Sequence, residues 1–188
     1  MPDLHALGPQ DALIIVDLQR DFCPGGSLAI DEGDKVVSVL NQWIDWALVA
    51  GSVIVASRDW HPATHMSFKS EGGPWPPHCV QDTPGARFHP ALQLPSGVWK
   101  VTKGVRFDKD QYSAFDETGL AHALRLRGIR RVWIGGLALD VCVKATARDA
   151  VAEGFETHVI CQACRPVTTE GGAQALADLR TEGAHLEP

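Results

Sequence analysis

The sequence has 188 residues, of which 45% are hydrophobic and 21% charged, and its formal net charge is −6 at pH 7. This size and composition predict one globular domain over residues 1–188, large enough to bury a hydrophobic core. The acidic balance argues against nucleic acid or an anionic membrane as a partner, and no apolar run approaches the roughly 18 residues of a membrane span.

The first half of the chain predicts buried strands around one helix, followed by a long irregular segment. Continuous apolar runs predict strands over 11–17 and 52–57. Between them, apolar residues recur at helical spacing over 33–51, and Gly51 is expected to end that helix. The span from Arg58 to about Pro95 is rich in Pro, Gly, His and Trp and has no clear period. An irregular stretch of this length is usually functional.

The second half of the chain alternates strands and helices more regularly. Strands are predicted over 97–104, 131–136 and 156–162. Helices are predicted over 116–128, with Asp116 as its N-cap, and over 140–153 and 169–183. Apolar strands that alternate with helices predict an α/β fold, with a parallel sheet covered by helices on both faces.

Polar residues of chemical interest fall at the carboxyl ends of these strands, where such sheets bind ligands. Asp17 ends the first strand, Lys103 ends the third, and Cys142 follows the fourth. Asp59 and His61 follow the second strand as an Asp-x-His pair. Each residue also has an ordinary interpretation, as a cap, a solvated strand end or a small core residue. Their coincidence at one edge favours a shared site.

The cysteine, the carboxylate and the lysine make chemical sense together. The first turn of a helix favours a thiolate, so Cys142 is a candidate nucleophile. Asp17 can serve as its base if burial raises the pKa of that carboxyl toward neutrality. The Lys103 ammonium would favour the ionised thiol and orient both partners.

Four stretches of the chain resemble the nicotinamidase/pyrazinamidase group of the isochorismatase-like cysteine hydrolases. They are "IIVDLQRDFCPGGSL", "ASRDWHPATHMSF" with "GPWPPHCV", "TKGVRFDKDQYSAF" and "GGLALDVCVKATARDA". The likeness covers about residues 11–168, in order and with comparable spacing. It implies six parallel strands in the order 3-2-1-4-5-6, with Asp17, Lys103 and Cys142 as the catalytic residues.

The resemblance also implies a divalent metal ion bound by Asp59, His61 and His78. A fourth protein ligand, where the family has one, would be His65 or Glu71, with His65 slightly favoured. Nitrogen and oxygen ligands suit Zn²⁺ best here, with Fe²⁺ or Mn²⁺ as alternatives. In the family the ion holds the ring nitrogen of the substrate.

The substrate pocket and the oxyanion hole follow from the same resemblance. The substrate-binding residues would be Phe22 and Trp75, which sandwich the ring, together with Tyr112 and Leu137. The backbone N–H groups of Ala138 and Cys142 would form the oxyanion hole, after a cis peptide bond between Leu137 and Ala138.

The implied activity is hydrolysis of nicotinamide to nicotinate and ammonia through a cysteine thioester, within NAD salvage, with pyrazinamide as a second substrate. One alternative is a related cysteine amidase that acts on a carbamoyl or ureido compound. Others are an isochorismate hydrolase and a non-catalytic relative that serves as a binding partner. Five cysteines and no signal-peptide pattern predict a cytoplasmic enzyme with a small-molecule substrate. Homo-oligomerisation stays open.

Overall fold

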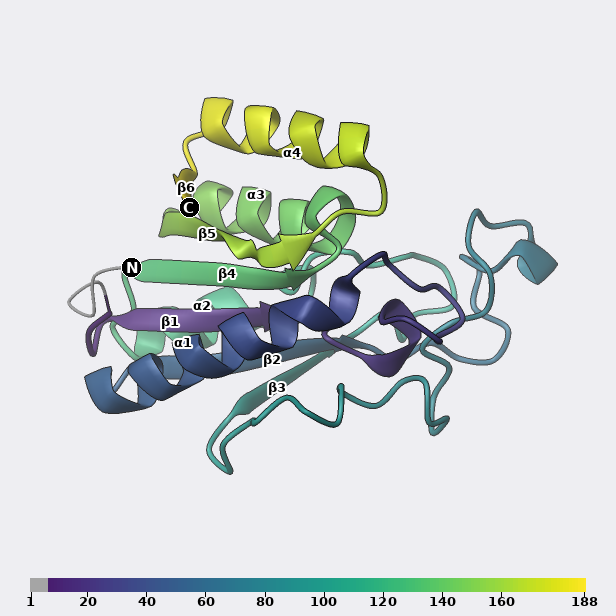
Figure 1. Ribbon diagram of the computed structural model, residues 1–188, viewed down its shortest axis with the longest axis horizontal. Helices are drawn as coiled ribbons and strands as arrows, with labels where there is room; N and C mark the ends of the chain where they lie inside the picture. Colours follow the sequence, from purple (N-terminus) through teal and green to yellow (C-terminus); the bar gives the residue numbers. More distant parts are fainter. Residues whose placement is uncertain (1–6) are drawn as a thin grey trace.

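The computed structural model describes residues 7–188 and contains a six-stranded sheet in the order β3-β2-β1-β4-β5-β6 (Figure 1). Every pairing between neighbouring strands is parallel, which confirms the predicted sheet and the strand order. The strands are β1 (Asp11–Val16), β2 (Val53–Asp59), β3 (Trp99–Lys103), β4 (Arg131–Leu137), β5 (Glu156–Arg165) and β6 (His185–Glu187).

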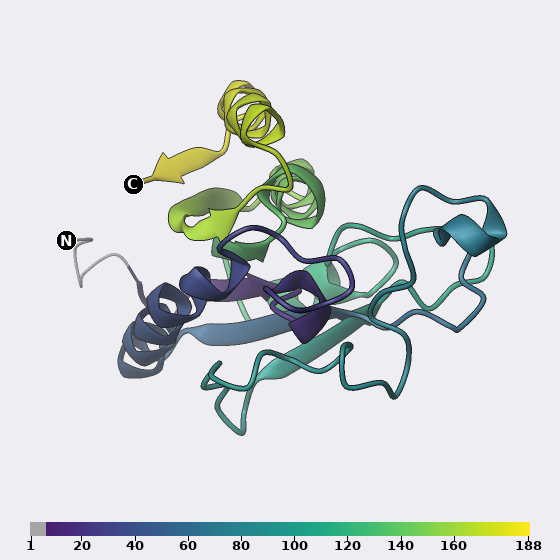
Figure 2. The same ribbon diagram turned by 45° about the vertical axis from the view of Figure 1, so that its right-hand side comes forward.

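Helices cover the two faces of the sheet, because alternate side chains of each strand point in opposite directions. On one face, Leu13 and Ile15 of β1 share a buried cluster with α1 (Val36–Ala50). On the other face, Ile14 packs in a second cluster with three further helices (Figure 2). These are α2 (Leu120–Leu126), α3 (Lys144–Ala152) and α4 (Thr169–Thr181). Both faces of β1 are buried, as its continuous apolar sequence predicts.

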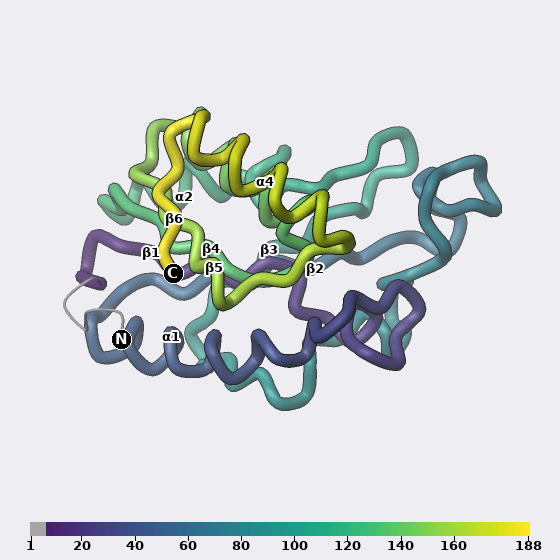
Figure 3. The backbone as a smooth tube through the Cα atoms, turned by 45° about the horizontal axis from the view of Figure 1, so that its top comes forward, coloured from purple at the N-terminus to yellow at the C-terminus, as the bar shows by residue number. Residues whose placement is uncertain are grey.

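The irregular segment between β2 and β3 first extends beyond the carboxyl ends of the strands and then returns alongside the sheet to the start of β3 (Figures 1 and 3). Its one short helix is a 3₁₀ turn at Lys69–Glu71. Isolated bridges fix its course, pairing His61 with Val80 and Phe68 with Trp75. The long stretch expected to be functional therefore covers the edge of the sheet where ligands are expected.

Three elements differ from the sequence prediction. The second helix begins at Leu120, so Asp116 is not its N-cap, and the Asp116 carboxylate instead lies 2.7 Å from the Lys109 ammonium. The helix after β4 starts with a π-helical turn, Leu139–Val143, before α3. Strand β6 is only three residues long, too short to give a sequence period.

Within residues 7–188, none of the helices combines the length and the apolar character that a bilayer crossing requires. The cytoplasmic location remains a prediction.

Candidate active site

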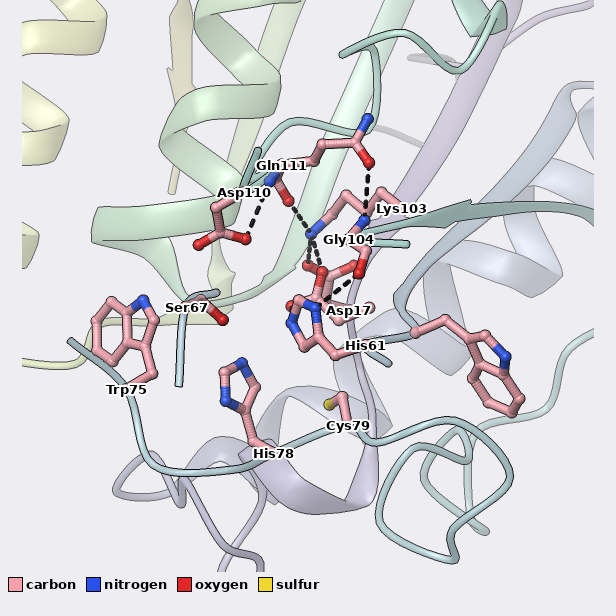
Figure 4. Close-up of polar contacts among 12 residues, drawn as sticks. Asp17, His61, Ser67, Trp75, His78, Cys79, Lys103, Gly104, Asp110 and Gln111 are labelled. Carbon is pink, nitrogen blue, oxygen red and sulfur yellow. Dashed lines mark hydrogen bonds and ion pairs between the residues drawn. The ribbon is translucent and has the colours of Figure 1, made fainter. Parts of the chain in front are cut away.

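Asp17, Lys103 and Cys142 meet at the carboxyl edge of the sheet, although they are far apart in the chain. Asp17 directly follows β1, Lys103 is the last residue of β3, and Cys142 lies in the π-helical turn after β4. The Lys103 Nζ atom is 2.7 Å from Asp17 Oδ2 (Figure 4). It is also 3.5 Å from Cys142 Sγ. All three side chains are buried. The sheet thus brings together the three groups that the sequence placed at its edge.

The backbone turns sharply at Asp17 and leaves one carboxylate oxygen facing the site. Asp17 has a left-handed φ of 45°, and the Ser57 hydroxyl donates a 2.7 Å hydrogen bond to its Oδ1. Its Oδ2 is buried and, within residues 7–188, has the Lys103 ammonium beside it but accepts no directed hydrogen bond. This oxygen lies beside a positive charge but accepts no directed hydrogen bond from the described residues, so it can accept a proton.

Gly136 is required for this close approach between the ends of β1 and β4. Its φ is 133°, and a Cβ atom built there would lie 2.0 Å from the Val16 carbonyl oxygen. The next residues form the expected cis peptide bond between Leu137 and Ala138. The chain then enters the turn that carries Cys142.

Burial and neighbouring charges together set the ionisation of the three groups. It raises the pKa of the Asp17 carboxyl above its ordinary value, against the opposing effect of Lys103. It also raises the pKa of the Cys142 thiol, again against Lys103. The pKa of Lys103 is raised because the Asp17 and Asp59 carboxylates outweigh its desolvation. Desolvation of the thiol thus opposes the effects of the helix terminus and of Lys103, which favour the thiolate. The thiol needs a base.

Asp59, His61 and His78 form a second group beside the first. One potential ligand atom from each lies within 4.8 Å of the others. The His61 Nδ1 atom is 2.8 Å from the Gly104 carbonyl oxygen, and His78 Nδ1 is 2.8 Å from the Pro76 carbonyl oxygen. A carbonyl only accepts, so both Nδ1 atoms donate, which leaves each Nε2 as a lone-pair ligand. Metal-binding histidines are usually oriented in this way.

Asp59 connects the two groups. Its Oδ1 accepts a 2.5 Å hydrogen bond from Lys103, and its Oδ2 lies 3.6 Å from His61 Nε2. Burial alone would raise the pKa of this carboxyl, but Lys103 and His61 hold it below its usual range. Asp59 therefore stays ionised, as a metal ligand must. The Lys103 ammonium lies between two carboxylates and a sulfur.

The two candidates for a fourth metal ligand differ in environment. His65 is buried, its ring stacks on His61 with centroids 4.2 Å apart, and its Nδ1 is 2.7 Å from the Ser67 hydroxyl. Its Nε2 is buried without a hydrogen-bond partner among the described residues. Glu71 is exposed. An orphaned buried nitrogen next to His61 favours His65.

A pocket opens beside Cys142 and the metal-binding group. It is lined by Phe22, Trp75 and Tyr112, three of the predicted substrate-binding residues, and also by Ala138 and Asp110. The Trp75 indole N–H donates a 3.2 Å hydrogen bond to the Tyr112 hydroxyl at the pocket wall. Leu137 was predicted to bind the substrate, but it does not line this pocket. Its side chain is fully buried in the cluster on the α1 face of the sheet.

Two glutamines form hydrogen bonds with residues of the site. They were not identified from the sequence. Gln19 Nε2 donates to the Asp59 carbonyl oxygen at 2.7 Å, and its Oε1 accepts from the Asp59 N–H at 2.8 Å. Gln111 accepts at its Oε1 from the Gly104 N–H at 3.1 Å, and its carbonyl oxygen is 3.3 Å from Lys103 Nζ (Figure 4). Both lie within motifs quoted above, but their contacts are between distant segments.

Comparisons with known proteins agree with this geometry. The family model described as "Isochorismatase domain" matches residues 11–187. The nicotinamidase of Escherichia coli (strain K12) is 40% identical over 201 aligned positions, covering 95% of this chain and 94% of the relative.

Two solved structures have the same fold. One is a pyrazinamidase of Pyrococcus horikoshii in complex with zinc, at 45% identity and a TM-score of 0.92, covering 95% of this chain and 98% of the other. The other is PnC1 of L. infantum in complex with nicotinate, at 38% identity and a TM-score of 0.89, covering 96% and 93%.

Proposed function

The chain belongs to the isochorismatase domain family, and we propose that it is a nicotinamidase that hydrolyses nicotinamide to nicotinate and ammonia through a thioester on Cys142. Pyrazinamide is a second substrate, and the nicotinate formed enters NAD salvage. The observation that carries the proposal is the position of the Lys103 ammonium, in contact with the thiol, the candidate base and a candidate metal ligand. The buried Lys103 ammonium therefore contacts both the candidate nucleophile and the metal-binding group.

Asp59, His61 and His78 would hold one divalent ion, with His65 as a fourth ligand. The fit is supported by the two Nε2 atoms left free by carbonyl contacts and by the orphaned His65 Nε2. Imidazole and carboxylate ligands suit Zn²⁺, which is the ion we propose. When bound, the ion supplies a Lewis acid that orients the substrate through its ring nitrogen.

Acylation begins with the substrate ring between Phe22 and Trp75 and its carboxamide at Cys142. Asp17 takes the thiol proton as the sulfur attacks the carboxamide carbon, and Lys103 stabilises the developing charge on sulfur. The backbone N–H groups of Ala138 and Cys142 bind the oxyanion of the tetrahedral intermediate. Asp17 then gives its proton to the departing nitrogen, the C–N bond breaks, and ammonia leaves.

Deacylation reuses the same carboxylate. Asp17 accepts a proton from a water molecule as the water oxygen attacks the thioester carbon. The C–S bond then breaks, and the sulfur recovers the proton from Asp17. The product is nicotinic acid, which ionises to nicotinate, and the Cys142 thiol and the Asp17 carboxylate are restored. The raised pKa of Asp17 suits it to both directions of this transfer.

A small amide panel tests the proposed activity. We expect ammonia release from nicotinamide and pyrazinamide, a much lower rate with benzamide, which lacks the ring nitrogen, and none from a ureido compound. Ammonia is measured with a coupled enzyme assay on protein loaded with Zn²⁺. Faster release from the ureido compound than from nicotinamide would instead support the alternative amidase.

Gly104 offers a test of the metal site that does not rely on activity. Its φ is 69°, and an added Cβ would lie 2.5 Å from His61 Cε1 and 2.7 Å from its Nδ1. We expect Gly104→Ala to displace the His61 ring and weaken Zn²⁺ binding about 10–100-fold, as for other contacts that orient metal ligands. The matched control is Gly97→Ala, two residues before β3, where an added Cβ meets open space. Equal Zn²⁺ affinity of the two variants would contradict the proposed role of His61.

A further inference from the structure

A second group of metal-ligating side chains lies at the opposite edge of the sheet. Glu156 and His158 are at the start of β5, and His185 and Glu187 are the ends of β6. His158 pairs in register with His185 in the parallel ladder. Because side chains alternate along a strand, all four lie on the same face of the sheet. The active site is at the carboxyl ends of the strands, so this group is separate from it (Figure 1).

Two polar contacts and two stacked rings hold the His158 side chain in place. Its Nδ1 is 2.8 Å from Glu187 Oε1 and its Nε2 is 3.0 Å from Glu156 Oε1. Its ring stacks between Trp133 and His185, with centroid distances of 4.2 Å and 4.7 Å. The residue is only 8% exposed, whereas Glu156 and His185 are exposed. The buried His158 imidazole therefore has the accessible Glu156 carboxylate beside its Nε2, and the accessible His185 imidazole stacks on its ring.

We propose that Glu156, His158 and His185 bind a second divalent cation of the Zn²⁺ class. One potential ligand atom from each lies within 4.8 Å of the others, the same spread as in the group at the active site. The Glu187 carboxylate holds the His158 Nδ1–H, which orients the ring and leaves Nε2 for the metal. Two imidazoles and a carboxylate favour Zn²⁺ over Mg²⁺ or Ca²⁺, and water completes the coordination at the exposed side.

The surrounding charge is compatible with a cation. Two carboxylates face His158, and the Arg131 guanidinium lies 3.9 Å from Glu156 Oε1. Arg131 makes closer contacts with Asp11, at 2.7 Å and 2.8 Å. A bound ion would join β6, a three-residue strand at the end of the sheet, to β5. Zn²⁺ bound here therefore stabilises the last strand and leaves hydrolysis unchanged.

The test counts Zn²⁺ ions per chain by elemental analysis after equilibrium dialysis against Zn²⁺ alone. We expect two ions in the unmodified chain and one in His185→Gln. In a His61→Gln/His78→Gln background, which lacks the active-site ligands, one ion should remain, and adding His185→Gln should remove it. The control is His122→Gln, an exposed histidine on α2, which should change no count. Zn²⁺ should also raise the melting temperature of the double variant, but not of the triple variant.

Two results would overturn the proposal. One is a single ion in the unmodified chain and none in the double variant. The other is a second ion whose affinity falls less than tenfold on His185→Gln. Should the double variant not fold, the comparison between the unmodified chain and His185→Gln decides alone. Neither result depends on which amide the enzyme hydrolyses.

Discussion

Replacing Cys142 with alanine is expected to lower kcat for nicotinamide hydrolysis by about 10⁴-fold or more, because the reaction loses its nucleophile. Cys142 is 5% exposed, lines the pocket and lies 3.5 Å from Lys103 Nζ. Ammonia release measured on Zn²⁺-loaded protein checks this. Turnover in Cys142→Ala within tenfold of the unmodified chain would rule out the thioester route.

The matched control for this variant is Cys164→Ala. Cys164 is also a buried cysteine, but it lies in β5, opposite Gly136, and does not line the pocket. The Cys164→Ala variant should retain full turnover even if its stability falls. Hydroxylamine added to the reaction gives a second readout, because it competes with water for a thioester and yields the hydroxamate of nicotinate. The hydroxamate should form with Cys164→Ala and not with Cys142→Ala.

The meeting of Asp17 with Lys103 was predictable because a general rule fixes it. Parallel strands place their carboxyl ends at one edge, and both residues stand at the carboxyl ends of predicted strands. The same rule brought Cys142 to that edge after β4. The spacing of Asp59 and His61 similarly places both on one side of an extended chain. These predictions needed only local patterns and the direction of each strand.

Other features depend on contacts that no local pattern encodes. Gln111 reaches Gly104 and Lys103 only because an irregular loop folds back over β3. Burial raises the pKa of the Cys142 thiol, and the helix-terminus argument could not include that burial. Leu137 points into the core because the turn after β4 directs its side chain to the α1 face. Burial and side-chain direction are set by the packed fold.

Asp17→Asn is expected to lower kcat for nicotinamide by about 10²–10⁴-fold, the usual contribution of a general base. Asparagine has nearly the same shape and can still accept the hydrogen bond from Ser57, but it cannot take the thiol proton. Lys103 would keep its 2.5 Å contact with Asp59, so the site should stay assembled. The measurement is the rate of ammonia release under saturating substrate.

An aryl ester of nicotinate separates proton transfer from structural damage. Its phenolate leaves without protonation, so Asp17→Asn should slow the ester less than the amide, whereas a distorted site would slow both equally. Asp11→Asn is the matched control, because Asp11 is a buried aspartate that begins β1, the strand that Asp17 follows, and pairs with Arg131 at 2.7 Å. It should lower the melting temperature and leave turnover unchanged. Equal losses on ester and amide in Asp17→Asn would show that Asp17 supports the site without moving the proton.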